Sequence, residues 1–163
     1  MIVVSNTSPL TNLAAIGHFD LLRELFGQIH IAEGVWRELS HEGRRHPGSH
    51  EVENASWVDR HEVENRMLVT ILRRDLDRGE AETLALAIEM KADLVLLDEQ
   101  EGRHAASRLG LHPLGVLGIL LQAKRLRKID EVRSRLDALR QQAGFFLGES
   151  LYRDVLKQAG EEA

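Results

Sequence analysis

The segment Asp93-Leu94-Val95-Leu96-Leu97-Asp98 is a continuous apolar run of strand length with an acidic residue at each end. Strands that are buried on both faces, as in parallel sheets, have runs of this kind in place of alternating apolar and polar residues. A second short run, Ile2-Val3-Val4, leads into the polar turn Ser5-Asn6-Thr7-Ser8-Pro9, which is followed by apolar residues at helical spacing. Strands that alternate with helices of about 10 to 15 residues indicate βαβ units. The sequence therefore predicts an α/β fold with a mainly parallel, doubly wound sheet.

The rest of the chain continues this alternation. We expect further strands at residues 28–31, at 111–114, and at 57–58 and 61–63 as one irregular strand. We expect helices at residues 10–16, 19–26, 32–39, 66–75, 77–90, 100–109, 116–126, 130–142 and 149–158. The polar segment 40–56 has almost nothing to bury and is predicted to be a mobile surface segment. Because no repeat and no linker divides the chain, we expect one domain over residues 1–163.

Composition excludes several classes of protein. The chain has 163 residues, of which 43% are hydrophobic and 29% charged, and this balance is typical of a globular domain. It has no Cys, which excludes disulfides, thiolate zinc sites, iron–sulfur clusters and Cys nucleophiles. The net charge of −5 is not that of a nucleic-acid coat protein. No apolar run is long enough to span a membrane and no signal peptide is evident, so we expect a cytoplasmic protein without membrane contact.

Polar and acidic residues follow the ends of two predicted strands. Asn6 follows the strand at 2–4 and Asp98 follows the strand at 94–97. The carboxyl ends of parallel strands share one edge of a sheet, where ligands bind, so these two residues are expected to be neighbours. Glu38, late in a helix, and Glu80, early in another, are expected to converge on the same edge. Glu101 lies three residues after Asp98, on the same face of a predicted first helical turn.

Clustered carboxylates repel one another unless a hard cation neutralises them. Mg²⁺ and Mn²⁺ prefer oxygen ligands, retain water and assist phosphate chemistry, so the cluster indicates metal-assisted hydrolysis of a phosphodiester. Helix capping is the alternative explanation for each residue taken alone. Asp77-x-x-Glu80 and Asp98-x-x-Glu101 both fit a cap followed by Glu at the third position, and Asn6 fits a helix N-cap.

Several segments together resemble a PIN domain. They are Ser5–Leu10, Val35–Leu39, Gly79–Ala87, Asp93–Asp98 with Glu99 and Gly102-Arg103, Gly144–Leu147 and Glu149–Tyr152. Within this family the chain is most similar to a PIN-like subgroup of unknown function and to VapC-type toxins. The separation of 18 positions between Glu80 and Asp98 matches the family's spacing between its last two major acids. The similarity extends over nearly the whole chain and rests on the order and spacing of the segments.

The resemblance implies a three-layer α/β/α fold with a short, mainly parallel central sheet flanked by helices, and with residues of about 130–160 as a family-typical extension. It also implies an Mg²⁺- or Mn²⁺-dependent ribonuclease, often the toxin of a type II toxin–antitoxin pair. Asn6, Glu38, Glu80 and Asp98 would stand for the acidic quartet, with Glu101 or Glu99 as an auxiliary acid. Thr7 and Ser8 would be supporting hydroxyls. The family's first acid is usually Asp, and Asn6 brings no charge in its place.

Other groups could contact partners. The segment 124–140 is locally basic, and Arg103, Lys124, Arg125, Arg127 and Lys128 are candidates to bind RNA phosphates; ion pairs on an exposed helix would explain the same residues. His41, His46 and His50 could bind a transition metal, although a solvated loop is the simpler explanation. Phe145, Phe146, Leu151 and Tyr152 gather near the C-terminus, either as core residues or as a homodimer or antitoxin surface.

Two functions are therefore expected from the sequence. The first is a metal-dependent endoribonuclease, a homodimer held inactive by an antitoxin. The second is a PIN-like module that has lost turnover and binds RNA or a protein partner, and Asn6 is the residue that suggests it.

Overall fold

A computed structural model of the chain describes residues 1–40 and 46–161. Its centre is a five-stranded sheet, all of it parallel, with the strand order β3-β2-β1-β4-β5. The strands are β1 (Val3–Ser5), β2 (Ile29–Ala32), β3 (Val58–His61), β4 (Leu94–Leu96) and β5 (Pro113–Leu114). The order reverses direction on either side of β1, as the doubly wound prediction requires.

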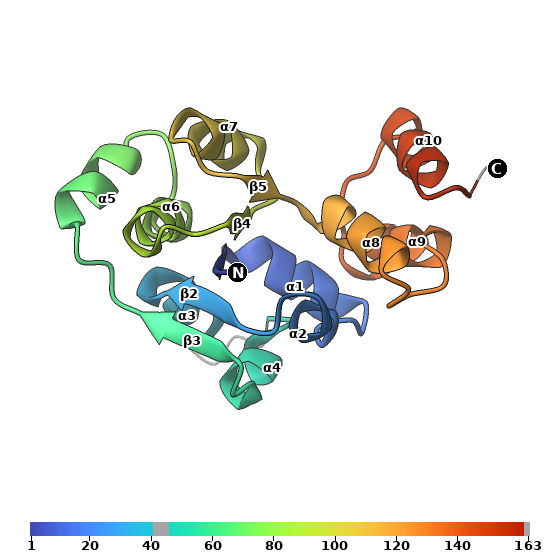
Figure 1. The fold of residues 1–163 in the computed structure, drawn as a ribbon, viewed down its shortest axis with the longest axis horizontal. Coiled ribbons are helices and arrows are strands. Elements are labelled where there is room, and N and C mark those ends of the chain that lie inside the picture. The colour runs from blue at the N-terminus through green and yellow to red at the C-terminus, as the bar shows by residue number, and fades with distance from the viewer. Residues whose placement is uncertain (41–45, 162–163) are drawn as a thin grey trace.

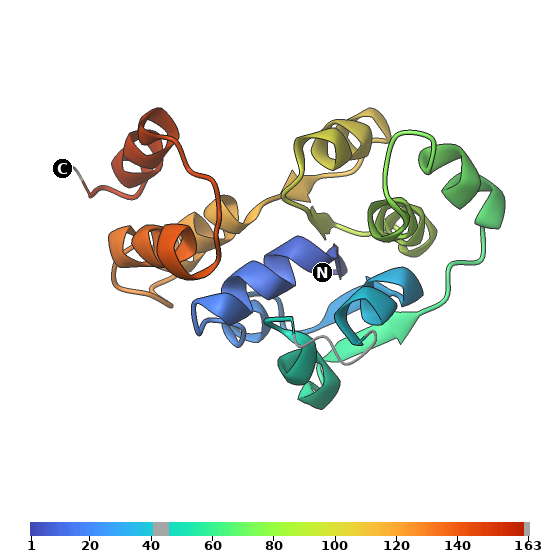
Figure 2. The same ribbon diagram turned by 180° about the vertical axis from the view of Figure 1, so that it is seen from behind.

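Helices cover both faces of the sheet and make a three-layer α/β/α fold (Figure 1). They are α1 (Thr7–Ala15), α2 (Leu21–Phe26), α3 (Glu33–Ser40), α4 (Ser49–Asn54), α5 (Arg66–Leu72), α6 (Arg78–Met90), α7 (Gln100–Arg108), α8 (Val116–Arg125), α9 (Arg133–Gln142) and α10 (Glu149–Gln158). The C-terminal helices α8 to α10 lie at one end of the molecule and α5 at the other, as the two opposite views show (Figures 1 and 2).

Two hydrophobic cores lie on the two faces of the sheet. Val3 and Leu96 point into the core formed with α1, α2 and α8 to α10. Val4, Ala32 and Val95 point into the other core, formed with α5, α6 and α7. Neighbouring residues of β1 and of β4 thus enter opposite cores, which is why these two central strands have no polar face. This confirms the fold class that the apolar run at 93–98 predicts.

The register of β1 and β4 brings two segments distant in sequence together. Val4 lies beside Val95 and Ser5 beside Leu96, and the Asn6 N–H donates to the Leu96 carbonyl over 2.9 Å. The chain leaves β1 at Asn6 and leaves β4 shortly before Asp98. The two residues therefore emerge at the same edge of the sheet.

Two predictions of local structure are wrong. Part of the segment predicted to be mobile and structureless forms α4, in which Val52 is buried and the Ser49 hydroxyl donates to the Leu39 carbonyl. One buried side chain is enough to hold so short a helix against α3. Residues 41–45 of the same predicted segment lie outside the described residues. The segment expected to be an irregular strand is regular, since all four residues of β3 pair with β2. Its polar residues are tolerated because β3 is at the edge of the sheet.

Among the described residues, no helix combines the length and the apolar composition that crossing a membrane would require.

Candidate functional site

Asn6 stands between β1 and α1, and it is buried, with 4% of its surface exposed. It occupies the N-cap position of α1, but its side chain makes no capping hydrogen bond. Its Nδ2 donates to Glu99 Oε2 over 3.5 Å, and its Oδ1 accepts from the Thr83 hydroxyl over the same distance. Helix capping therefore does not account for this side chain, whose amide lies among acidic residues from other elements.

Glu38 reaches the same place from α3. Its Oε2 accepts a 2.8 Å hydrogen bond from the hydroxyl of Thr7, in the first turn of α1. A methyl group added to Gly79, in the first turn of α6, would lie 3.0 Å from Glu38 Oε2 and 3.5 Å from Asn6 Oδ1. The lack of a side chain at Gly79 is therefore what allows these two oxygens to approach the start of α6.

Glu80 is buried at the start of α6, where it also serves as a helix cap. Asp77 Oδ1 accepts from the Glu80 N–H, and Glu80 Oε1 accepts from the Asp77 N–H over 3.1 Å, so the predicted capping box is confirmed. Burial raises the pKa of Glu80 to about 7; the charges of Asp77 and Glu99 also raise it, and the Asp77 N–H opposes them. Capping uses Oε1, and the second carboxylate oxygen remains for other partners.

Asp98 is held by two hydrogen bonds at the end of the strand region. Its Oδ1 accepts from the Val116 N–H, at the start of α8, over 2.8 Å, and its Oδ2 accepts from Asn12 of α1 over 3.1 Å. The cap of α7 is Glu99, so the interpretation of Asp98 as the cap of that helix is wrong. Burial raises the pKa of Asp98, and the charge of Glu99 adds to this, while the two hydrogen bonds and the Arg103 guanidinium lower it.

Of the two auxiliary acids predicted, Glu99 is the one that contacts the cluster. Its carboxylate accepts from Asn6 and from the Ser8 hydroxyl. Glu101 is exposed in the first turn of α7. The chain turns at Asp98 and Glu99 before α7 begins at Gln100, and this turn directs Glu99 towards the start of α1. Thr7 and Ser8, the predicted supporting hydroxyls, thus donate to Glu38 and Glu99 respectively.

Two grooves adjoin the cluster. One, of about 260 Å³, is lined by Glu38 and by polar residues of α1, among them Thr7, Ser8 and Asn12. The other, of about 400 Å³, is lined by Asp98 and Arg103 and by apolar side chains that include Phe145 and Leu151. Glu38 and Asp98 therefore open onto different grooves, with Asn12 hydrogen-bonded to Asp98 between them.

The donors of this cluster fit a hydrated divalent cation. They are carboxylate and amide oxygens, which are the ligands of Mg²⁺ and Mn²⁺, and they carry more negative charge than the neighbouring Arg103 can neutralise. Among the described residues, these carboxylates do not form a group of three with ligand atoms all within 4.8 Å of one another. Each is instead held by a hydrogen bond, so ligation by one or two carboxylates with the remaining ligands being water suits the arrangement.

The basic residues predicted to contact RNA fall into two groups. Arg103 is exposed beside Asp98 and Gly115, at the second groove. Lys124 is half-buried and pairs with Glu161 over 2.7 Å. Arg125 ends the ten-residue helix α8, so it lies about 15 Å from the Asp98 contact at the start of that helix. Arg127 and Lys128 follow it on the exposed surface. Only Arg103 adjoins the cluster.

Glu82 is a buried carboxylate that the sequence analysis did not single out. It is fully buried, accepts from the Gly34 N–H over 2.9 Å and pairs with Arg78 over 2.7 Å and Arg66 over 3.4 Å. Burial would raise the pKa of Glu82, but the hydrogen bonds from Arg78 and Gly34 outweigh it and the pKa is lowered. It joins α3, which carries Glu38, to α6, which carries Glu80. The feature of the sequence that could have indicated a buried acid here is the position of Glu82 within the otherwise mostly apolar stretch Ala81–Ala87.

Comparison with known proteins places this geometry in a family. The sequence profile of the PIN domain matches residues 2–161, nearly the whole chain. No curated protein matches it. PIN domains are generally nucleases, and they typically use divalent metal ions. The extent of the match, together with the parallel three-layer fold, shows that the chain belongs to the PIN domain family.

Proposed function

We propose that the protein is a metal-dependent endoribonuclease whose site is the cluster of Asn6, Glu38, Glu80, Asp98 and Glu99. The observation that carries the proposal is the convergence of these side chains, from elements distant in sequence, on the carboxyl edge of a parallel sheet. Mg²⁺ or Mn²⁺ bound there would supply a Lewis acid for the phosphodiester and a water of lowered pKa. A nuclease of this kind needs no nucleophilic side chain.

The residues of the chain would divide the work as follows. Glu38, Glu80 and Asp98 would ligate the cation directly or through water, and Asn6 would orient a water through Oδ1. Glu99 would contribute a further carboxylate oxygen, and its contact with Ser8 fixes its direction. Arg103, beside Asp98, would contact a phosphate of the RNA in the second groove. The two grooves that adjoin Glu38 and Asp98 would allow a single strand to pass across the cluster.

Cleavage of a labelled single-stranded RNA tests the assignment. We expect Mn²⁺-dependent cleavage by the native protein, suppressed by a chelator, and a loss of at least about 100-fold in Asp98→Asn, because several kcal/mol of transition-state stabilisation depend on the bound cation. Glu101→Gln is the matched control: it is an exposed carboxylate of the same segment and should cleave at the native rate. Equal rates in the native and Asp98→Asn proteins would refute the assignment.

A binding module without turnover is the second candidate, and the contacts of Asn6 favour it. The neutral amide donates to Glu99, so the cluster is less negative than one with Asp at this position would be. If this candidate holds, the native protein binds RNA but does not cleave it, and Asn6→Asp creates Mn²⁺-dependent cleavage. Native cleavage that Asn6→Asp leaves unchanged would exclude it.

We further propose that a protein partner covers the groove beside Asp98. Phe146 is 91% exposed and Leu151 is 47% exposed, and the groove next to them is lined by Phe145, Leu151 and Asp98. A partner segment with apolar side chains and a basic group would bury this surface and meet the acidic cluster. An antitoxin, in a toxin–antitoxin pair, is the partner that we expect, and a second copy of the chain in a homodimer is the alternative partner.

The family match over 2–161 supports one PIN-like domain with α9 and α10 as its extension.

A further inference from the structure

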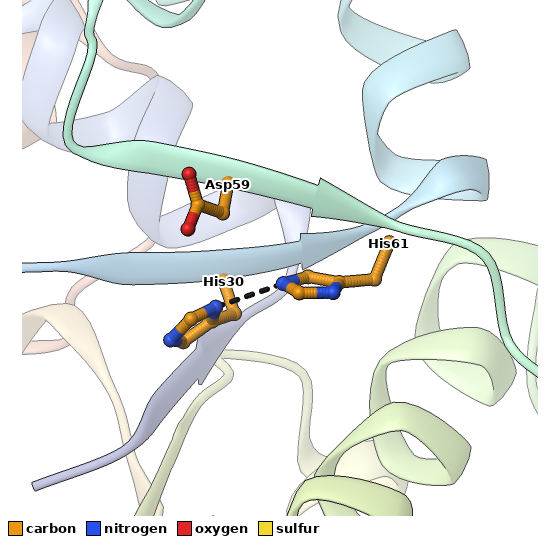
Figure 3. Close-up of side chains that lie close together, drawn as sticks. All are labelled: His30, Asp59 and His61. Atoms are coloured by element: carbon orange, nitrogen blue, oxygen red, sulfur yellow. Dashed lines mark hydrogen bonds between the residues drawn. The ribbon is translucent and has the colours of Figure 1, made fainter.

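We infer that His30, Asp59 and His61 form a second metal site, for Zn²⁺ or a similar transition-metal ion, on the edge of the sheet. Each offers one ligand atom, and the three atoms all lie within 4.8 Å of one another. Figure 3 shows the imidazoles of His30, on β2, and His61, on β3, turned towards each other, with Asp59 of β3 beside them. This site does not depend on the proposed nuclease function, because none of its residues contributes to the cluster around Asp98.

Strand register is what brings the three side chains together. In the parallel pair of β2 and β3, His30 is the partner of Asp59 and Ala32 is the partner of His61. Side chains two residues apart on a strand share a face, so Asp59 and His61 lie on the face to which His30 and Ala32 point. Ala32 packs in the core formed with α5 to α7, which identifies that face. All three ligands are half-buried, so they are ordered by their surroundings and still reachable by an ion.

The geometry of the imidazoles is close to that of a zinc site. His30 Nδ1 and His61 Nε2 lie 2.9 Å apart, and the rings are inclined at 50°. Two nitrogens at about 2.0–2.1 Å from a tetrahedral Zn²⁺ are about 3.3 Å apart, so the rings must separate by only about 0.4 Å. The ion would replace the proton that the two nitrogens now share.

Asp59 accepts a hydrogen bond from a further side chain, as carboxylates that bind metals usually do. Gln28, two residues before His30 on the same side of the chain, donates from Nε2 to Asp59 Oδ2. This contact orients the carboxylate and uses one of its two oxygens. Two imidazole nitrogens and one carboxylate oxygen form a donor set for Zn²⁺, Co²⁺ or Ni²⁺ in preference to Mg²⁺. Three protein ligands leave a fourth position for water.

A metal ion bound at this site would stabilise the edge of the sheet. β3 is the outermost strand and pairs only with β2 among the strands that the structure describes. A bound ion would join the two strands through side chains, in addition to their backbone hydrogen bonds, and would stabilise the edge against opening. We therefore expect Zn²⁺ to raise the melting temperature of the protein by several degrees.

Calorimetric titration of the native protein with Zn²⁺ tests the inference, with Co²⁺ absorption as a second readout of tetrahedral nitrogen and oxygen ligands. We expect His61→Ala and Asp59→Asn each to weaken Zn²⁺ binding by at least about tenfold and to abolish the rise in melting temperature. His104→Ala, which removes an exposed histidine of α7, is the matched control and should bind as the native protein does. Asp59→Asn keeps the shape of the side chain, so it remains informative if an alanine variant does not fold.

Two further variants separate this site from others in the chain. Asp98→Ala should retain the Zn²⁺ binding that His61→Ala loses, since the acidic cluster is a different site. The pair His46→Ala and His50→Ala removes two histidines of the polar segment and should also leave Zn²⁺ binding intact. Loss of binding in this double variant, or equal Zn²⁺ affinity in the native and His61→Ala proteins, would overturn the inference.

Discussion

Asn6 is a neutral side chain among carboxylates, and both ends of its amide are engaged. Its Nδ2 faces Glu99 and its Oδ1 faces Thr83, each at 3.5 Å. A carboxylate in this position would have no hydrogen to offer Glu99 and would repel it. The amide therefore allows the acidic residues to lie close together without a cation, and the same neutrality should weaken the binding of one.

Replacing Asn6 by Asp should reverse this balance. We expect Asn6→Asp to lower the free energy of unfolding of the metal-free protein by about 1–2 kcal/mol, because it leaves a buried carboxylate facing Glu99, and to raise the affinity for Mn²⁺. Thermal unfolding with and without Mn²⁺ measures both effects. Asn54→Asp, at an exposed position on α4, controls for the added charge. A stability and an Mn²⁺ affinity that stay at the native level would contradict this account of Asn6.

Glu82 is a buried carboxylate that links α3, which carries Glu38, to α6, which carries Glu80. We expect Glu82→Gln to lower the free energy of unfolding by about 2–4 kcal/mol. The carboxamide has an NH2 group in place of one carboxylate oxygen, so it loses a hydrogen-bond acceptor and the negative charge that pairs with Arg78. Urea denaturation measures the loss. Glu89→Gln on the same helix is the control: its amide oxygen can still accept from the Asn65 N–H, so its loss should stay below about 1 kcal/mol.

Single residues were predictable from sequence where a strand end decided their position. Asn6 and Asp98 follow β1 and β4, and the parallel sheet brings them to one edge. The choice between Glu99 and Glu101 was not predictable, because it depends on the turn before α7. His30 and His61 were missed, because only the register of β2 on β3 brings them together. In the sequence, His41, His46 and His50 form a more evident group of histidines.

At the scale of elements, helix capping accounts for only part of the acidic cluster. The Asp77 and Glu80 pattern forms a complete capping box on α6, whereas the side chains of Asn6 and Asp98 cap neither α1 nor α7. A capping pattern in sequence therefore identified one real cap of three. Polar elements were predicted least well, since α4 buries mainly Val52 and β3 is half-exposed at the sheet edge. Hydrophobic periodicity has little to detect in such segments.

The capping box makes a prediction about α6. We expect Asp77→Ala to lower the free energy of unfolding by about 1 kcal/mol, because the first turn loses the acceptor of the Glu80 N–H. Denaturant unfolding measures this loss. Asn65→Ala, which removes the side-chain cap of the shorter helix α5, should lower the free energy of unfolding by less than Asp77→Ala does. Equal stability of the native and Asp77→Ala proteins would contradict the assigned role of the box.

At the scale of the whole molecule, Glu80 makes stability depend on pH. Its pKa is about 7 in the folded metal-free protein and lower in the unfolded chain, so folding favours the protonated form. The stabilisation from Glu80 is complete below about pH 4.5 and is lost as the pH rises through about 7. The raised pKa of Asp98 acts in the same direction.

Urea denaturation between pH 5 and 8 should reveal this dependence. We expect the difference in unfolding free energy between the native protein and Glu80→Gln to fall as the pH rises, because Gln does not titrate. The lowered pKa of Glu82 is common to both proteins and cancels in the difference. A difference that is constant over this range would mean that Glu80 has an ordinary pKa. Mn²⁺ should flatten the dependence in the native protein by stabilising the ionised carboxylate.

The central claim is that side chains from several elements share one divalent cation at the carboxyl edge of the sheet. Calorimetric titration with Mn²⁺ of the native protein, Glu38→Gln and Asp98→Asn tests this most directly, with Glu101→Gln as control. The account predicts one saturable Mn²⁺ site in the native and control proteins, weakened at least about tenfold in both other variants. Mn²⁺ binding that is absent from the native protein, or that both substitutions leave unchanged, would contradict it.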